Sequence, residues 1–198
     1  DLQLSIIKMR DYHIDVAPGY GWPLHQRPWV NPSPNASSLN MSRCFAGTVL
    51  LEGTELSEGR GTTVPLELIG APDFPAQAVL DYLQRHQPAW LVGAYLRPCY
   101  FSPTFHKHQG LLCQGIQIHT DLSDYNHDAF KPYRLVAGLL KALRDVQPDY
   151  ALWRRHEYEY ELDRLPIDVI NGGDFLRLWV DNPAATFADL DAQLQEQE

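Results

Sequence analysis

The segment from Glu52 to Thr63 carries residue types that could bind a sugar and cleave a glycosidic bond. It places three carboxylates, four hydroxyls and an arginine flanked by glycines within twelve residues. The planar fork of Arg60 suits a carboxylate, and oxygen-bearing side chains suit sugar hydroxyls. Glycosidic cleavage needs two carboxylates, one as acid and one as base or nucleophile. The structural alternative is a turn in which Glu52 or Glu58 merely pairs with Arg60.

A second polar stretch contains two histidines that alternate along the chain. If this stretch is extended, His106 and His108 face the same side, and with His119 and Asp121 they have the side-chain types of a zinc site. Their spacing matches no zinc motif, so we predict no metal. His106 and Lys107 are instead candidates to contact a carboxylate-bearing sugar, with plain surface charge as the alternative.

The composition argues against several classes of protein. The formal net charge is -9 and the 16 lysines and arginines are scattered, whereas a nucleic-acid-binding face must be basic. No apolar run reaches the roughly 20 residues of a transmembrane helix. No dinucleotide fingerprint or nucleophile elbow is present, and we expect no cofactor. The three cysteines match neither a zinc ribbon nor a redox pair and are predicted to be buried apolar residues.

The elements that position these residues are predicted to interleave strands and helices. Alternating or short apolar runs predict strands, and apolar residues at helical spacing predict helices. This order predicts a single α/β or α+β domain with a mixed β-sheet of about five strands flanked by helices. The predicted strands are 2–9, 45–51, 91–100, 111–120 and 158–162, and the predicted helices are 76–86, 133–146, 174–180 and 186–195, the last capped by Thr186.

Aromatic side chains could serve as platforms for the flat faces of sugars. Strand aromatics such as Tyr95 are more often part of the core. Trp22 and Trp29 are the better platform candidates because they lie in a loop, residues 19–40, that is rich in Pro, Gly, Ser and Asn.

Several ordered blocks of the sequence resemble the second half of NamZ-type exo-β-N-acetylmuramidases, a family long catalogued only as a domain of unknown function. The first blocks are WVNPSPN at 29–35, LEGTELSEGRGTT at 51–63, and 65–72 with its Gly-Ala-Pro. The blocks at 103–107, 113–119, 158–160 and 166–168 follow in the family's order. The resemblance covers nearly the whole chain.

This resemblance implies an enzyme that releases N-acetylmuramic acid from the non-reducing ends of peptidoglycan fragments, in the periplasm or outside the cell. Family members join an N-terminal Rossmann-like domain to a C-terminal α/β domain, with the cleft between them. Residues 1–198 resemble the C-terminal domain, and the start at Asp1 without an initiator Met also predicts a fragment. Its expected partners are a peptidoglycan-derived glycan and the N-terminal domain of the same parent, and we expect the fragment alone to be inactive.

The family's Glu-Gly-Thr and Gly-Arg-Gly-Thr elements mark cleft-lining positions in this sequence. The glutamate usually assigned as catalytic belongs to the N-terminal half, so the catalytic acid of this chain is unknown and Glu52 is the best candidate within it. The expected substrate-binding residues are Glu52, Ser57, Arg60, Gly61, Thr62, Asn35, His106 and Lys107.

Three features depart from the family pattern. Glu55 stands where the family commonly has Asn, Asp73 stands where an aromatic residue often follows Gly-Ala-Pro, and the aromatic-rich ending is missing after Gln195. These departures affect the expected substrate detail and the C-terminal boundary. The alternative function is a non-catalytic glycan-binding or interaction domain.

Overall fold

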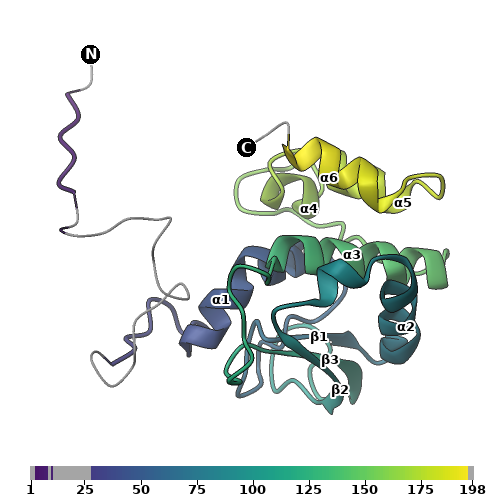
Figure 1. The fold of residues 1–198 in the computed structure, drawn as a ribbon, viewed down its shortest axis with the longest axis horizontal. Helices are drawn as coiled ribbons and strands as arrows, with labels where there is room; N and C mark the ends of the chain where they lie inside the picture. The colour runs from purple at the N-terminus through teal and green to yellow at the C-terminus, as the bar shows by residue number, and fades with distance from the viewer. Residues whose placement is uncertain (1–2, 9, 11–27, 196–198) are drawn as a thin grey trace.

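The computed structural model describes residues 3–8, 10 and 28–195. Its elements form three layers: α1, α2 and α3 lie over one side of a small sheet, and α4, α5 and α6 lie on the far side of α3 (Figure 1). The elements in chain order are α1 (Leu39–Thr48), the 3-10 helix η3 (Val49–Gly53), β1 (Leu68–Ala71), α2 (Ala76–His86), the 3-10 helix η4 (Pro88–Leu91), β2 (Tyr95–Phe101), β3 (Cys113–His119), α3 (Pro132–Val146), α4 (Pro166–Ile170), α5 (Phe175–Asp181) and α6 (Phe187–Gln195).

The sheet has three strands in the order β1-β3-β2, and both pairings are antiparallel. Ile69 lies opposite Ile116, and Leu96 lies opposite Ile118, which places apolar side chains on the face that the helices cover. At the outer edge of β1, the backbone of Ser57 exchanges two hydrogen bonds with Gly70. The glycine-flanked arginine loop is therefore attached directly to the sheet edge.

Helix α3 is the centre of the core. The predicted apolar stripe is buried, and Pro132 occupies the first helical turn, where a missing N–H costs nothing. The three cysteines are free and buried, as predicted. Within the described ranges, no helix combines the length and apolar character needed to cross a bilayer. The stripe consists of Leu135, Val136, Leu139, Leu140 and Leu143.

The predicted mixed sheet of about five strands is wrong, because the described residues contain one antiparallel sheet of three strands. The strand predicted at 45–51 belongs to α1 and η3 instead. The run TVLL at 48–51 begins with two β-branched residues and favours a strand locally, but Ser38 caps α1 by accepting a hydrogen bond from the Met41 N–H at 3.0 Å. The buried residues of α1 then recur at helical spacing, and packing against α3 decides the conformation.

Two further strand predictions are wrong for the residues that the structure describes. Residues 3–8 form no strand and are exposed, while residues 2 and 9 lie outside the described part. The strand predicted at 158–162 reduces to one bridge between Tyr158 and Glu161 around a tight turn, with Glu159 at φ 54°. Such a short reversal leaves no room for a ladder.

The helix predictions agree closely with the structure. Helix α2 has the predicted bounds, α3 and α6 differ from theirs by one residue at the start, and α5 is shifted by one residue at both ends. Thr186 and Asp189 exchange hydrogen bonds at the start of α6, which is the predicted cap. The strand β3 lies within its predicted range, and β2 starts four residues later and ends one residue later than predicted. The short helix α4 and the strand β1 were not predicted.

Candidate functional site

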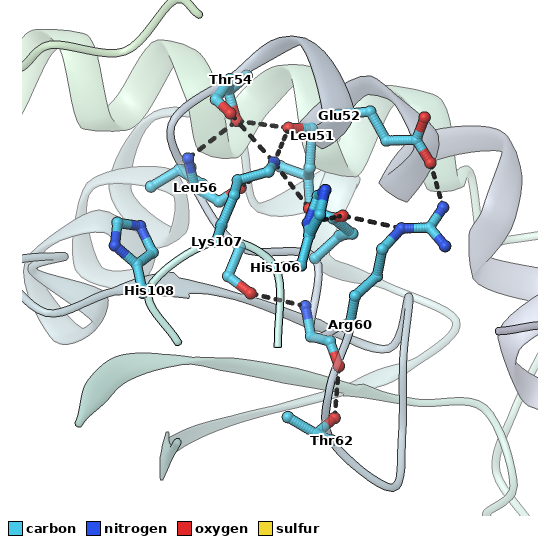
Figure 2. Close-up of polar contacts among 12 residues, drawn as sticks. Leu51, Glu52, Thr54, Leu56, Arg60, Thr62, His106, Lys107 and His108 are labelled. Atoms are coloured by element: carbon cyan, nitrogen blue, oxygen red, sulfur yellow. Dashed lines mark hydrogen bonds and ion pairs between the residues drawn. The ribbon is translucent and has the colours of Figure 1, made fainter. Parts of the chain in front are cut away.

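The ammonium group of Lys107 holds together the loop that follows α1. The loop between β2 and β3 inserts this side chain among three backbone carbonyls, those of Leu51 at 2.7 Å, Thr54 at 3.1 Å and Leu56 at 2.6 Å (Figure 2). Its fourth partner is Oε2 of Glu58 at 2.7 Å. The side chain is only 6 % exposed, so these contacts fix the backbone segment that carries Glu52.

The carboxylate of Glu58 is the buried centre of the site. Its side chain has no exposed surface, and its second oxygen faces Nε of Arg60 at 3.0 Å and Nδ1 of His106 at 3.4 Å. Burial alone would raise the pKa of Glu58, but the adjacent Lys107 ammonium outweighs it and holds this pKa below its ordinary value. Burial lowers the pKa of Lys107, and the Glu58 charge limits that drop. Each group therefore favours the charged form of the other.

Arg60 links this buried pair to Glu52. Its Nε donates to Glu58, and its Nη2 donates to Oε1 of Glu52. The other oxygen of Glu52 accepts a hydrogen bond from the Tyr158 hydroxyl at 3.0 Å. Burial and the neighbouring Glu52 charge raise the pKa of Tyr158 to about 12, so the phenol keeps its proton. Among the described residues, the second terminal nitrogen of Arg60, Nη1, has no acceptor.

A cavity of about 460 Å³ opens beside the Glu52 end of this chain of contacts. Glu52, Arg60, Tyr158 and Asn35 line it together with apolar side chains from α1 and from the loop before it. Arg60 and Glu52 are 22 % and 20 % exposed, so solvent and ligands reach them. The remaining lining residues are Pro32, Ser33, Ala36, Met41, Ser42, Phe45, Val49 and Leu66.

This arrangement suits recognition of a polar ring with one apolar face. Carboxylate and phenol oxygens can accept hydrogen bonds from hydroxyls, a guanidinium nitrogen can donate to a carboxylate, and Phe45 offers an aromatic surface. An acid that protonates a leaving group must carry its proton on a carboxyl oxygen. Both oxygens of Glu52 instead accept hydrogen bonds, which favours a binding role.

Comparison with known proteins places the chain in a family. The family described as "Exo-beta-N-acetylmuramidase NamZ, C-terminal" matches residues 43–198. This chain belongs to that family. Peptidoglycan beta-N-acetylmuramidase NamZ of Bacillus subtilis (strain 168) is 31% identical over 183 residues, which cover 92% of this chain. The chain spans 39% of that protein's length.

Two crystal structures of DUF1343 family proteins from Bacteroides fragilis share the fold of this NamZ C-terminal domain. They superimpose with TM-scores of 0.59 and 0.56 at 18% and 19% sequence identity. Each match covers 84% of this chain, and 43% and 39% of the respective crystal structures. At this level of identity, the similarity establishes the fold.

Within this NamZ C-terminal domain, the predicted site residues have different surroundings. Asn35, Glu52 and Arg60 line one cavity although they come from separate segments. His106 is 41 % exposed beside Glu58, and burial lowers its pKa although the Glu58 charge opposes this. Lys107 lies inside, and its four partners leave its nitrogen no bond for a ligand.

Three other predicted residues hold the backbone of the arginine loop. The Ser57 side chain is buried and accepts from the Gly59 N–H at 3.1 Å. The Thr62 hydroxyl donates to the Gly59 carbonyl at 2.6 Å. Gly61 has φ 83°, and a Cβ there would lie 2.7 Å from the Phe105 nitrogen, so the loop needs glycine at this position.

The four residues considered as zinc ligands have separate partners. His106 faces Glu58, His108 contacts the Glu55 carbonyl at 2.8 Å, and His119 lies 3.6 Å from Asp121. In the described part of the chain, no three histidine, cysteine, aspartate or glutamate side chains gather in a group that could hold a metal.

Among the described residues, the aromatic side chains that line the cavity are Phe45 and Tyr158, and the predicted platform Trp29 does not line it. Trp29 donates its indole N–H to the Ala36 carbonyl at 2.9 Å, and Trp22 lies outside the described residues. Phe45 was missed because its segment was predicted to be a strand; the Ser38 cap was the signal for a helix. Tyr158 belongs to a family-like block, but nothing local connects it to Glu52.

Proposed function

We propose that this domain lines the sugar-binding cleft of an exo-β-N-acetylmuramidase that releases N-acetylmuramic acid from the non-reducing ends of peptidoglycan fragments. The observation that carries the proposal is the cavity in which Arg60 and Glu52 face an apolar wall. The name of the Bacillus subtilis relative, a peptidoglycan β-N-acetylmuramidase, supports this activity and substrate. Peptidoglycan fragments also support a site of action in the periplasm or outside the cell.

In this proposal, Arg60 binds the lactyl carboxylate that distinguishes muramic acid from other amino sugars. Its Nη1 is available, and a charge-assisted hydrogen bond to a carboxylate is among the stronger polar contacts. Two cations, Arg60 and Lys107, face two carboxylates, Glu52 and Glu58, so the site is electrically balanced before the ligand binds. Glu52 accepts hydrogen bonds from sugar hydroxyls, and Phe45 packs against the apolar face of the ring.

We also place the catalytic acid in an N-terminal domain of the same parent protein, which completes the cleft. Two facts support this arrangement: the chain spans 39% of the Bacillus subtilis relative, and Glu52 accepts hydrogen bonds on both oxygens. Glu52 is then a substrate-orienting residue.

The test is Arg60→Ala in the parent protein, assayed on the disaccharide of N-acetylmuramic acid and N-acetylglucosamine. Loss of a charge-assisted hydrogen bond costs about 1.5–3 kcal/mol, so we expect kcat/KM to fall by about 10- to 100-fold. Arg85→Ala is the matched control, because Arg85 is exposed on α2 and bonds the Asp81 carbonyl. An unchanged kcat/KM in Arg60→Ala would exclude Arg60 from the site.

A further inference from the structure

We infer that Tyr158 is a sugar-binding residue of this cavity, whose hydroxyl recognises a neutral hydrogen-bond donor of the sugar while Arg60 recognises its carboxylate. The inference rests on the proposed function, since it assumes that the cavity binds an amino sugar. The inference concerns a side chain that lies 106 residues after Glu52 in the sequence and contacts it in the folded chain.

The position of the Tyr158 hydroxyl is well defined. It lines the cavity and donates its proton to Oε2 of Glu52 at 3.0 Å. A phenol oxygen that donates its single proton still has lone pairs that can accept. Because the raised pKa of Tyr158 keeps the group neutral, this oxygen has acceptor capacity but no second proton to donate.

The polar groups of the cavity therefore offer two kinds of contact. Glu52 and Tyr158 present acceptor oxygens. Nη1 of Arg60 presents N–H donors without an acceptor among the described residues. A ligand that carries both a hydroxyl or amide N–H and a carboxylate can satisfy both kinds of contact. A carboxylate placed against Glu52 would meet a like charge, which favours the orientation that brings the carboxylate to Arg60.

The turn that carries Tyr158 also provides a matched control. Tyr160 lies two residues further along the same turn, has 99 % of its surface exposed and does not line the cavity. Tyr158→Phe and Tyr160→Phe remove the same hydroxyl from the same segment. In the first variant Glu52 remains bound to Arg60, and the aromatic ring keeps its packing.

The experiment measures binding of N-acetylmuramic acid and of N-acetylglucosamine to the parent protein by isothermal titration calorimetry. Both sugars carry the neutral donors, but only the first carries the carboxylate. We expect Tyr158→Phe to weaken both by about tenfold, the loss of one hydrogen bond. Arg60→Ala should weaken N-acetylmuramic acid alone, and Tyr160→Phe should bind both like the unmodified chain.

The outcomes separate this inference from the proposed function. If Arg60→Ala weakens N-acetylmuramic acid selectively while Tyr158→Phe binds both sugars normally, the role of Tyr158 is overturned and the proposed function stands. If neither sugar binds to the unmodified parent protein, both are overturned. Thermal unfolding of each variant verifies that a loss of affinity does not come from a loss of fold.

Discussion

Two buried lysines illustrate how differently charge is used in the helical layers and in the candidate site. Lys141 lies inside α3, and its nitrogen contacts Asp145 one turn later at 2.8 Å and the Asn182 carbonyl at 3.0 Å. Lys107 lies between loops and contacts Glu58 and three carbonyls. Their side chains are 2 % and 6 % exposed, so both are nearly enclosed.

The difference lies in their partners. Asp145 is 19 % exposed and also accepts from the Tyr82 hydroxyl at 2.6 Å, so it stays solvated and bonded without the lysine. Glu58 is completely buried and shares its other oxygen with Arg60. The Lys141–Asp145 pair lies on α3, a helix that its apolar packing already stabilises. The Lys107–Glu58 pair instead connects loops that have no regular backbone hydrogen bonds to hold them together.

The largest effect that would test this comparison is the loss of stability in Lys107→Met relative to Lys141→Met. Removing Lys107 leaves one oxygen of the buried Glu58 carboxylate and three backbone carbonyls without their donor, which costs about 3–5 kcal/mol. Removing Lys141 leaves a partly hydrated Asp145 and costs about 1–2 kcal/mol. Urea denaturation of both variants measures the free energy of unfolding, and equal losses would contradict the distinction.

A double variant verifies the cause of the larger loss. Lys107→Met combined with Glu58→Leu removes both charges, so its loss should be clearly smaller than the sum of the two single losses. A strictly additive result would mean that the two residues act independently.

A second, smaller effect is an acid sensitivity that originates in the site. Burial lowers the pKa of His106; for Glu58, burial acts upward but Lys107 brings the pKa below its ordinary value. The folded chain therefore binds fewer protons than the unfolded chain just below the ordinary pKa of each group, 6.5 and 4.5. The stability that these two groups contribute should be complete above pH 6.5, fall in a first step below it and fall in a second step below 4.5.

Variants assign the two steps of this profile. His106→Asn should reduce the upper step, which it shares with His156, and Glu58→Gln should reduce the lower one, as measured by the free energy of unfolding between pH 3 and pH 8. A profile of unchanged shape in Glu58→Gln would show that the acid sensitivity arises elsewhere in the chain.

The smallest expected effect concerns Arg60, where stability and binding should separate. Its ion pairs lie at a solvent-accessible cavity, so Arg60→Ala should change the free energy of unfolding by about 0–1 kcal/mol. In this variant the Glu58 carboxylate remains paired with Lys107, and Glu52 still accepts the hydrogen bond from the Tyr158 hydroxyl. A loss comparable to that of Lys107→Met would make Arg60 a structural residue like Lys107 and weaken its assignment to ligand binding.

Sequence alone was sufficient where the information is local. The apolar residues from Leu135 to Leu143 recur at helical spacing. This pattern predicts α3 without any knowledge of what the helix packs against. The proximity of Glu52 and Arg60 also follows from one short glycine-containing loop. The same local reasoning failed at Phe45, because the apolar run at 48–51 is typical of a strand. The cap at Ser38 and the packing of α1 against α3 make the segment helical instead.

Only the tertiary structure decided which polar residues face the cavity and which lie inside. Neighbouring positions in the loop between β2 and β3 have different environments: His106 is partly exposed, and Lys107 is enclosed by carbonyls from a distant segment. Tyr158 meets Glu52 only because the chain returns to the arginine loop after α3. Residue type and spacing determined the helices and the likeness to the family, since both depend on short segments; burial and long-range pairing depend on how those segments pack.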